Sequence, residues 1–483
     1  MVWSHLLIFC MVGTIVSWMV IYGIMHSKLD NFLTHAAEPH HTHSKRTSRA
    51  GGIGIIIGFI AVYILFNVLF QFVGEKEYPY EVIFWGALAI FTLGLVDDIR
   101  SVPAGYKFLF QIIIAIITHE YGFRIDQIDI PFLELKLDLR GISLILTVLW
   151  FVSIMNLINL IDGLDGLAGG VGLMLMILLV ILGMEKGISA SIYLSIGMAG
   201  AIFGFLIHNF PPAKVYMGDS GAYTIGYVIA ALSLMNFQKG AVIAALIGPM
   251  IALSLPIIDV LFAIMRRFMQ GLPIFRPDKG HIHHQLIRSG FSHKNTVLIL
   301  YGISLLALTG GVLVFSNQGR YFPLFLGFIM VAVIFVARIS QNNPFQIKSV
   351  IFDSLESRNK IQNSVRLSRW FIEEADKCEN SEALWNDYQF LLRKLGFAEV
   401  ILQLGGVKKI FKGEDLEKSA VLESLFFHFD SENKEDAIQF YAGKAGMTER
   451  KFSLLSEIAF ETWVLALKRW KSKNSMSFKF DSH

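Results

Sequence analysis

Three stretches of the sequence hold side-chain oxygen atoms in a pattern that could bind a metal ion and a phosphorylated substrate. The residues are Asp97 and Asp98 in the first stretch, Asn156, Asn159, Asp162 and Asp165 in the second, and Asp219 in the third. Hard oxygen donors are the ligands that Mg²⁺ uses, whereas softer metals are usually bound by thiolates or clustered imidazoles. The pattern therefore favours Mg²⁺ over a softer metal.

The acidic pair Asp97 and Asp98 follows an apolar block directly, and Lys107 opens the next block. Adjacent carboxylates repel each other unless a cation or a shared proton relieves the repulsion. One interpretation is that the pair belongs to a binding site in which a cation lies beside the carboxylates. The alternative is a solvated polar cap at the end of a helix.

The second stretch repeats a polar residue at every third position from Asn156 to Asp165. A helix that continued through this stretch would place the four side chains along one face. A polar cap before a glycine turn would explain one Asn and one Asp, but not four oxygen donors in register. Gly163 and Gly166 allow backbone geometries that bring main-chain groups close to a ligand.

The third stretch places Asp219 and Ser220 between two glycines, with Asn209 before them in the same connection. Glycine on both sides predicts a tight turn that can aim the Asp219 carboxylate inward. An ordinary turn without a ligand is the alternative interpretation.

The cationic residues gather in a long loop that contains Arg276, Lys279, His281, His283, His284 and Arg288. The histidine spacing would also suit zinc, but no cysteine is near and the flanking cations would oppose a dication. Three imidazoles among fixed cations suit an anion with several oxygen atoms, such as a pyrophosphate. A loop that is basic only because it faces the cytoplasm is the third interpretation.

A second basic stretch ends in Arg49, just before Gly51 and Gly52 at the start of an apolar block. Basic residues beside a membrane usually signal topology. An arginine at the start of a helix can also contact a phosphate, so Arg49 is a candidate substrate-binding residue.

The elements that must position these residues are membrane-spanning helices. The chain has 483 residues, of which 54% are hydrophobic and 17% charged, and its mean hydropathy is +0.54. This composition excludes a disordered, fibrous or disulfide-rich secreted protein. The net charge of +3 is too small to suggest a nucleic-acid partner.

Apolar blocks of membrane-spanning length predict an all-α polytopic membrane protein with about 11 transmembrane helices. The blocks lie near residues 5–25, 51–72, 81–96, 106–120, 142–161, 167–184, 189–208, 221–237, 240–266, 295–316 and 320–338. If the amino terminus is outside, most lysines and arginines lie in inner loops, as the positive-inside rule requires. This orientation places all five polar stretches on the cytoplasmic side.

Two regions differ from the apolar helices. Residues 124–140 alternate apolar and polar residues around Pro131 and predict a short outer hairpin. After a transmembrane domain assigned to residues 1–338, residues 339–483 are mixed in composition and predict a small cytoplasmic α+β domain. We expect helices near 348–374, 382–395 and 449–470 and strands near 400–404, 425–429 and 438–442, an order that loosely resembles a GAF domain.

The polar stretches together resemble the polyprenyl-phosphate N-acetylhexosamine-1-phosphate transferase family, membrane enzymes that start bacterial cell-envelope glycans. The resemblance covers about residues 1–338. The histidine loop looks like the branch that uses simple UDP-N-acetylhexosamines rather than the branch that uses a muramyl-pentapeptide. The matching residues are Ser48–Gly52, Asp97 and Asp98 with Lys107 and Phe108, Asn156–Gly170, Asn209 with Met217–Gly221, and Pro277–His284.

The resemblance implies that a UDP-N-acetylhexosamine and undecaprenyl phosphate react to give undecaprenyl-pyrophosphoryl-sugar and UMP. It implies that Asp219 and Asn159 bind Mg²⁺, with Mn²⁺ as the alternative ion. Asp97 resembles a residue that deprotonates or orients the lipid phosphate, and Asp98 lies beside it near the metal. The other implied substrate contacts are Lys107, Lys279, His281, His283 and His284 at the pyrophosphate and Asp162, Asp165 and Asn209 at the nucleoside, with Arg49 and Asn156 as further binding residues.

The resemblance also implies a multi-pass protein of the bacterial plasma membrane, embedded in the lipid bilayer, with a cytoplasmic active site and C-terminus. It leaves open a homodimer, a covalent intermediate, and a partner or ligand for the C-terminal domain. Two features depart from the family: the long tail, and Ala222 where relatives often have serine.

Two other functions stay open as alternatives. A transporter of anionic substrates would use intramembrane carboxylates as an ion relay, but here the carboxylates lie at the ends of the predicted spans. A membrane-anchored sensor would have its function in the tail, with the spans as passive support.

Overall fold

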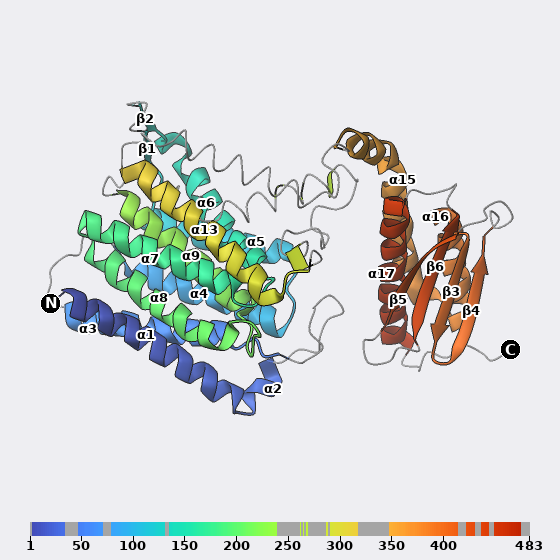
Figure 1. Ribbon diagram of the computed structural model, residues 1–483, viewed down its shortest axis with the longest axis horizontal. Coiled ribbons are helices and arrows are strands. Elements are labelled where there is room, and N and C mark those ends of the chain that lie inside the picture. Colours follow the sequence, from blue (N-terminus) through green and yellow to red (C-terminus); the bar gives the residue numbers. More distant parts are fainter. Residues whose placement is uncertain are drawn as a thin grey trace. The chain divides into compact units, whose positions relative to one another are not determined.

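The chain forms two compact units in a computed structural model (Figure 1). The structure describes residues 2–33, 47–70, 79–130, 135–238, 290–316, 347–413, 422–429, 436–443 and 449–474, with residues 261, 264, 267, 268, 286 and 287. The first unit contains the helices from α1 to α13, and the second contains the elements from α15 onward.

The first unit is a bundle of long apolar helices. Six helical segments in its described part are long and apolar enough to cross a membrane, as expected of a polytopic membrane protein. The helices are α1 (Val2–Met25), α2 (Leu29–Leu33), α3 (Gly51–Phe70), α4 (Glu81–Ile99), α5 (Ala104–Glu120), α6 (Ser143–Ile161), α7 (Leu167–Lys186), α8 (Ser189–Asn209), α9 (Gly218–Gln238) and α13 (His293–Ser316).

Most of the predicted spans coincide with described helices. The spans predicted near 240–266 and 320–338 fall almost wholly outside the described residues, so the total of eleven stays a prediction. Helix α4 continues beyond the predicted block to Ile99, and α9 begins before its block, at Gly218. The acidic pair on α4 and Asp219 on α9 therefore belong to helix ends rather than to loops.

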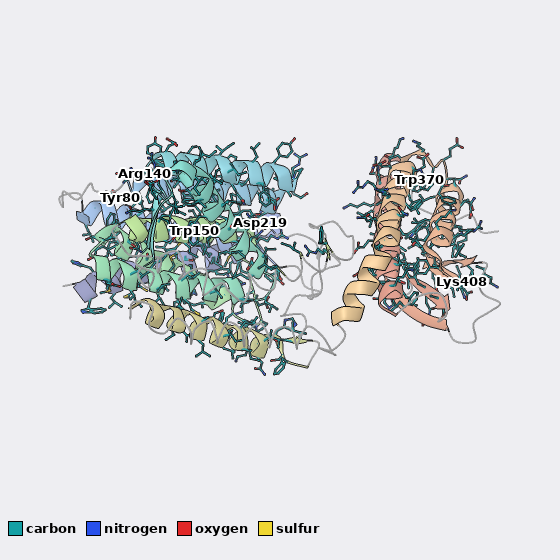
Figure 2. All side chains as sticks on the ribbon, turned by 90° about the horizontal axis from the view of Figure 1, so that it is seen from above. Tyr80, Arg140, Trp150, Asp219, Trp370 and Lys408 are labelled. Carbon is teal, nitrogen blue, oxygen red and sulfur yellow. The ribbon has the colours of Figure 1, made fainter. Side chains whose placement is uncertain are left out.

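A β-hairpin joins the far ends of α5 and α6. It consists of β1 (Gln127–Ile130) and β2 (Leu135–Asp138), which pair antiparallel as predicted, and the short helix η2 (Arg140–Ile142) follows it. Because α5 and α6 each run the length of the bundle, the hairpin lies away from the start of α5. Figure 2 shows Arg140, beside the hairpin, and Asp219 towards different ends of the first unit.

Glycines bring α1 and α8 into backbone contact. A Cβ atom added at Gly13 would overlap the carbonyl oxygen of Gly197, and one added at Gly200 would overlap that of Cys10. Small residues at such crossings allow close van der Waals packing between helices, which stabilises helix pairs in a membrane. The glycines of this pair are therefore a packing requirement of the fold.

The second unit has an antiparallel sheet covered by helices. The strand order is β4-β3-β6-β5, and every neighbouring pair is antiparallel. Its core includes Phe371, Tyr388, Phe440 and Trp463, all fully buried. The elements are α15 (Ile347–Glu374), η4 (Ala375–Lys377), α16 (Ser381–Leu395), β3 (Glu399–Leu404), β4 (Val407–Lys412), β5 (Leu422–His428), β6 (Ala437–Gly443) and α17 (Glu449–Asn474).

The predicted helices and strands of the tail agree with these elements, except that the sequence analysis missed β4. This strand carries Lys408, Lys409 and Lys412, which obscure the alternation expected of a half-buried strand. It is an edge strand, and lysines on an edge discourage pairing with other chains. The domain boundary at residue 338, the GAF-like character and the cytoplasmic location stay predictions.

We predict that Gly13→Val destabilises the first unit, because the new side chain would meet the backbone of α8 rather than a movable side chain. Overpacking of this kind costs about 1–3 kcal/mol of folding free energy. The midpoint of thermal unfolding in detergent measures the effect. The control is Gly23→Val on the same helix, because a Cβ at Gly23 meets no atom within 4 Å. Equal midpoints for the two variants would contradict the packing described.

Candidate active site

The first turn of α9 lies directly against the last turns of α4. A Cβ atom added at Gly94 on α4 would overlap the backbone of Ser220, and one added at Gly218 would overlap the Asp98 carboxylate. Gly218 has a φ of +72°, a left-handed conformation that other residues adopt at a cost. Glycine at these two positions therefore allows the acidic pair to reach the start of α9.

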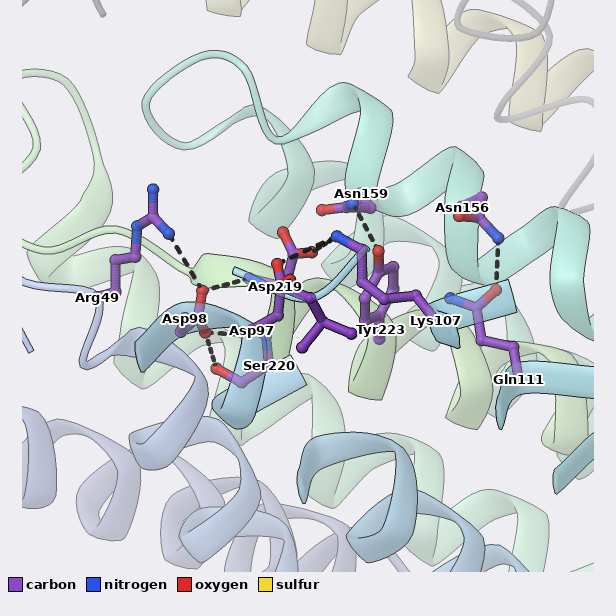
Figure 3. Close-up of polar contacts among 11 residues, drawn as sticks. Arg49, Asp97, Asp98, Lys107, Gln111, Asn156, Asn159, Asp219, Ser220 and Tyr223 are labelled. Atoms are coloured by element: carbon purple, nitrogen blue, oxygen red, sulfur yellow. Dashed lines mark hydrogen bonds and ion pairs between the residues drawn. The ribbon is translucent and has the colours of Figure 1, made fainter. Parts of the chain in front are cut away.

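The Asp98 carboxylate caps α9 from a neighbouring helix (Figure 3). Its Oδ1 accepts the backbone N–H of Asp219 at 2.9 Å, and its Oδ2 accepts the backbone N–H of Ser220 at 3.0 Å. The Ser220 hydroxyl donates to the same Oδ2 at 2.6 Å. The residue is only 2% exposed, so these bonds satisfy a buried charge and the unpaired N–H groups of a helix start.

Arg49 reaches this carboxylate from the segment before α3. Its guanidinium lies 3.7 Å from Asp98 Oδ1. The segment is held by three backbone bonds: Tyr216 N–H to the Ser48 carbonyl, Gly51 N–H to the Tyr216 carbonyl and Gly52 N–H to the Met217 carbonyl. The stretch around Arg49 is thus fixed to the connection that leads into α9.

Lys107 joins the other two carboxylates. Its ammonium lies 3.1 Å from Asp97 Oδ2 and 3.0 Å from Asp219 Oδ2. The second oxygen of Asp97 accepts the backbone N–H of Val102 at 2.7 Å, which fixes its orientation. One cation shared by two carboxylates leaves a net negative charge, which a further cation would compensate.

Tyr223 connects the Lys107 cluster to α6. The side-chain amide of Asn159 donates to the Tyr223 hydroxyl at 3.2 Å, and the Lys107 ammonium lies 6.0 Å from the centre of the Tyr223 ring. The sequence analysis did not select Tyr223. Its position one helical turn after Asp219 was the available signal, because residues four apart share a helix face.

The expectation that four polar residues share one helix face is wrong for the second stretch. Helix α6 ends at Ile161, so Asn156 and Asn159 lie on it, whereas Asp162 and Asp165 lie in the connection to α7. Asp162 follows the last residue of α6, and Gly166, with a φ of +80°, precedes the first residue of α7. Asn156 donates to the side chain of Gln111 at 2.7 Å.

Asp165 and Asn209 hold two connections together at the same end of the bundle. Asp165 Oδ2 accepts the backbone N–H of Ala213 at 2.9 Å. Asn209 Oδ1 accepts the backbone N–H of Gly166 at 2.8 Å, and its amide donates to the Val215 carbonyl at 2.7 Å. Both residues therefore fix the backbone of these two connections.

Asp162 lies in the electrostatic field of this cluster. Desolvation raises the pKa of its carboxyl group well above the ordinary value, and the carboxylates of Asp219 and Asp98 raise that pKa further. The contribution of these two carboxylates shows that Asp162 lies among negatively charged groups, in addition to being desolvated. The surroundings of Asp162 therefore favour a bound cation.

Asp219 and Asn159, the residues expected to bind Mg²⁺, carry oxygen donors of the kind that this ion uses. Within the described ranges, no three His, Cys, Asp or Glu side chains gather in a way that could hold a metal by themselves. Mg²⁺ is usually held by one or two carboxylates together with substrate phosphates and water, so a site with one carboxylate and an amide oxygen is compatible with this ion. Asp98 is less available to an ion because both of its oxygens already accept hydrogen bonds.

The structure thus brings together Arg49, Asp97, Asp98, Lys107, Asn159 and Asp219, with Asp162 close enough to interact electrostatically. Asp165 and Asn209 join the neighbouring connections. Lys279, His281, His283 and His284 lie outside the described residues, and their place in the site stays a prediction.

Comparison with known proteins links this arrangement to a family. Residues 80–236 match the family described as glycosyl transferase family 4, a region that contains every carboxylate of the site. The chain is 35% identical over 322 residues to the probable undecaprenyl-phosphate N-acetylglucosaminyl 1-phosphate transferase of Bacillus subtilis, covering 66% of this chain and 87% of that protein.

Two further relatives have similar descriptions. The chain is 34% identical over 317 residues to the decaprenyl-phosphate N-acetylglucosaminephosphotransferase of Mycobacterium tuberculosis, covering 60% of this chain and 78% of that protein. It is 29% identical over 303 residues to the undecaprenyl-phosphate alpha-N-acetylglucosaminyl 1-phosphate transferase of Haemophilus influenzae, covering 60% and 81%.

We predict that Asp98→Ala destabilises the protein by about 1–3 kcal/mol, because it leaves buried N–H groups of α9 without acceptors. Asp98→Asn keeps one acceptor oxygen and should lose less stability. Thermal unfolding of the purified variants in detergent measures both effects. Asp138→Ala, which removes an exposed carboxylate from the hairpin, serves as the control. An unchanged midpoint for Asp98→Ala would show that the cap is dispensable.

Proposed function

Because the chain belongs to the polyprenyl-phosphate N-acetylhexosamine-1-phosphate transferases of glycosyl transferase family 4, we propose that it couples a UDP-N-acetylhexosamine to undecaprenyl phosphate. An oxygen of the lipid phosphate forms a bond to the β-phosphorus of the UDP-sugar. The bond from this phosphorus to the bridging oxygen breaks, and UMP leaves with the bonding electrons. The product is undecaprenyl-pyrophosphoryl-sugar, which starts a cell-envelope glycan.

The observation that carries the proposal is the position of Lys107 between Asp97 and Asp219. Phosphoryl transfer depends mainly on positioning the reactants and on neutralising their charge. Lys107 supplies a fixed cation to the pyrophosphate, and the two carboxylates hold its ammonium in place. A phosphate monoester has a second pKa of about 6 and is largely dianionic at neutral pH, so Asp97 orients rather than deprotonates the lipid phosphate.

Asp219 and Asn159 hold Mg²⁺ in this proposal, with Mn²⁺ as the alternative ion. The first turn of α9 directs Asp219 towards the site, and Tyr223 fixes the amide of Asn159 so that its oxygen can face an ion. When bound, a divalent ion neutralises charge on the pyrophosphate oxygens and the leaving group. The Lys107 ammonium, 3.0 Å from Asp219 Oδ2, would add to this neutralisation.

The remaining predicted residues bind the rest of the substrate. The nucleoside is bound by Asp162, Asp165 and Asn209, which lie in or join the two connections beside the site. Asn156, on α6, is a further binding residue. Arg49 approaches the phosphates from the segment before α3. Lys279, His281, His283 and His284 complete the pyrophosphate site. The reaction takes place on the cytoplasmic side of the bacterial plasma membrane.

We predict that Asp219→Ala lowers UMP release by about 10²–10³-fold, as expected when a group that stabilises transition-state charge is removed. Membranes containing the protein are incubated with undecaprenyl phosphate and labelled UDP-GlcNAc, UDP-GalNAc or another UDP-sugar. Release of UMP and label in the lipid fraction are both measured. Asp138→Ala, an exposed carboxylate near the hairpin, should retain full turnover.

Unchanged turnover of the Asp219 variant would reject this assignment of the site. Uptake of UDP-sugar into vesicles without any lipid-linked product would instead favour a transporter.

Removal of divalent ions is expected to stop the reaction reversibly. Treatment with a chelator should abolish UMP release, and added Mg²⁺ should restore it, with Mn²⁺ as the substitute to compare. Thermal unfolding with and without Mg²⁺ gives a second readout that does not depend on turnover. The ion should raise the unfolding midpoint of the unsubstituted protein and not that of Asp219→Ala. Full activity in the chelator would contradict the metal assignment.

A further inference from the structure

The second unit carries an aromatic pair on its surface that its core does not use. Trp370 on α15 is 39% exposed and Phe390 on α16 is 43% exposed. Their ring centres are 5.8 Å apart and the rings meet edge to face. Because the two rings are in contact, their exposed parts form one apolar surface rather than two scattered ones.

Four cations lie close to this pair in sequence on the same two helices. Arg366 and Arg369 lie on α15, and Arg393 and Lys394 lie in the last turn of α16. The Lys394 ammonium lies 5.6 Å from the centre of the Phe390 ring. All four side chains are exposed, and none forms an ion pair with another residue in the described ranges. We call these six residues the α15/α16 patch.

The spacing of four of these residues places them in two pairs, one on each helix. Arg366 and Trp370 are four residues apart on α15, and Phe390 and Lys394 are four residues apart on α16, so each pair shares a helix face. The contact between Trp370 and Phe390 joins the two faces. The same parts of the two helices carry the carboxylates of Glu373 on α15 and Asp387 on α16, so the four cations outnumber them.

Aromatic rings among exposed lysines and arginines match the chemistry of an anionic lipid surface. The rings enter the boundary between headgroups and acyl chains, while the long cationic side chains stay among the headgroups. Each cation near such a surface contributes about 1 kcal/mol of attraction. A protein partner would have to be acidic as well as apolar to satisfy the same residues.

The chain itself keeps the patch near a membrane. Eight residues, 339–346, separate the last predicted span from the start of α15 at Ile347. They reach at most about 27 Å when fully extended. Trp370 lies about 35 Å along α15 from Ile347, at about 1.5 Å per residue. Both lengths are short enough for the patch to reach the surface of the membrane that holds the predicted span.

We propose that the α15/α16 patch docks the second unit onto the anionic surface of the membrane that holds the spans. The aromatic pair inserts at the headgroup boundary, and the four cations bind lipid phosphates. The docking depends on no step of the transfer reaction.

Cysteine labelling of the full chain in nanodiscs tests the docking. In a Cys10→Ser background, Asn386→Cys adds a thiol one turn before Phe390 without altering the patch. Burial raises the pKa of Cys378 to about 12, so this native thiol stays unreactive at neutral pH. Labelling by a membrane-impermeant maleimide should be at least tenfold slower in nanodiscs containing phosphatidylglycerol than in pure phosphatidylcholine.

Ile410→Cys is the matched control. Ile410 is 45% exposed on β4, and its neighbour Lys409 contacts Glu382 of α16, so Ile410 faces away from the helices. Its labelling rate should be the same in both lipids. The double substitution Arg369→Glu with Lys394→Glu should restore fast labelling of Asn386→Cys without lowering the unfolding midpoint, since both side chains are exposed.

Three outcomes would overturn the proposal. The first is an equal labelling rate in the two lipids, whether fast or slow. The second is protection that survives the double charge reversal. The third is protection in detergent that increases with protein concentration, because a second copy of the chain would then cover the patch.

Discussion

The three hydrogen bonds from the first turn of α9 to the Asp98 carboxylate are the contact on which the candidate site depends. A helix start exposes N–H groups without partners and carries a partial positive charge. The Asp98 carboxylate from α4 accepts these N–H groups and compensates this partial charge. It thereby fixes the backbone position from which the Asp219 side chain extends. Because Asp97 is adjacent to Asp98 in the chain, the same contact sets the distance between Asp97 and Asp219. A bond that resembles a structural cap thereby determines the geometry of the charged cluster.

The division of labour between the two adjacent aspartates follows from this contact. Asp98 faces α9 and is satisfied within the protein, whereas Asp97 faces Lys107 and shares that cation with Asp219. Two carboxylates and one ammonium form a cluster that is negative but not saturated, which suits the combination of a divalent ion and a phosphorylated substrate. If both aspartates were free, their repulsion would spread them apart. If both carboxylates accepted hydrogen bonds from a helix start, neither would be available to bind a cation in the site.

Much of this arrangement could be predicted from sequence, because membrane spans and clustered polar residues are strong signals. Apolar block lengths located the helices, and the alternation around Pro131 predicted the hairpin. The prediction that Asn156 to Asp165 share one helix face was wrong, because periodicity alone cannot distinguish a helix that continues from one that ends at a turn. Strand β4 was missed because its lysines, which suit a strand at the edge of a sheet, interrupt the alternation of apolar and polar residues that predicts a strand. The roles of Asp98 and Tyr223 depend on contacts between helices far apart in sequence, which spacing along one helix does not contain.

The second unit shows the same distinction between local pattern and tertiary contact. Phe371 is fully buried against Tyr388 and Trp463, and it follows Trp370 directly in the chain. Consecutive residues of a helix point about 100° apart, so these two aromatic side chains cannot enter one core. Helix α15 therefore presents large apolar groups to two different surroundings. One is the core that α16 and α17 complete. The other surrounding contains Phe390 and Lys394, and no further layer of protein covers it among the described residues. The cations near it give this surface a positive charge that complements anionic lipid.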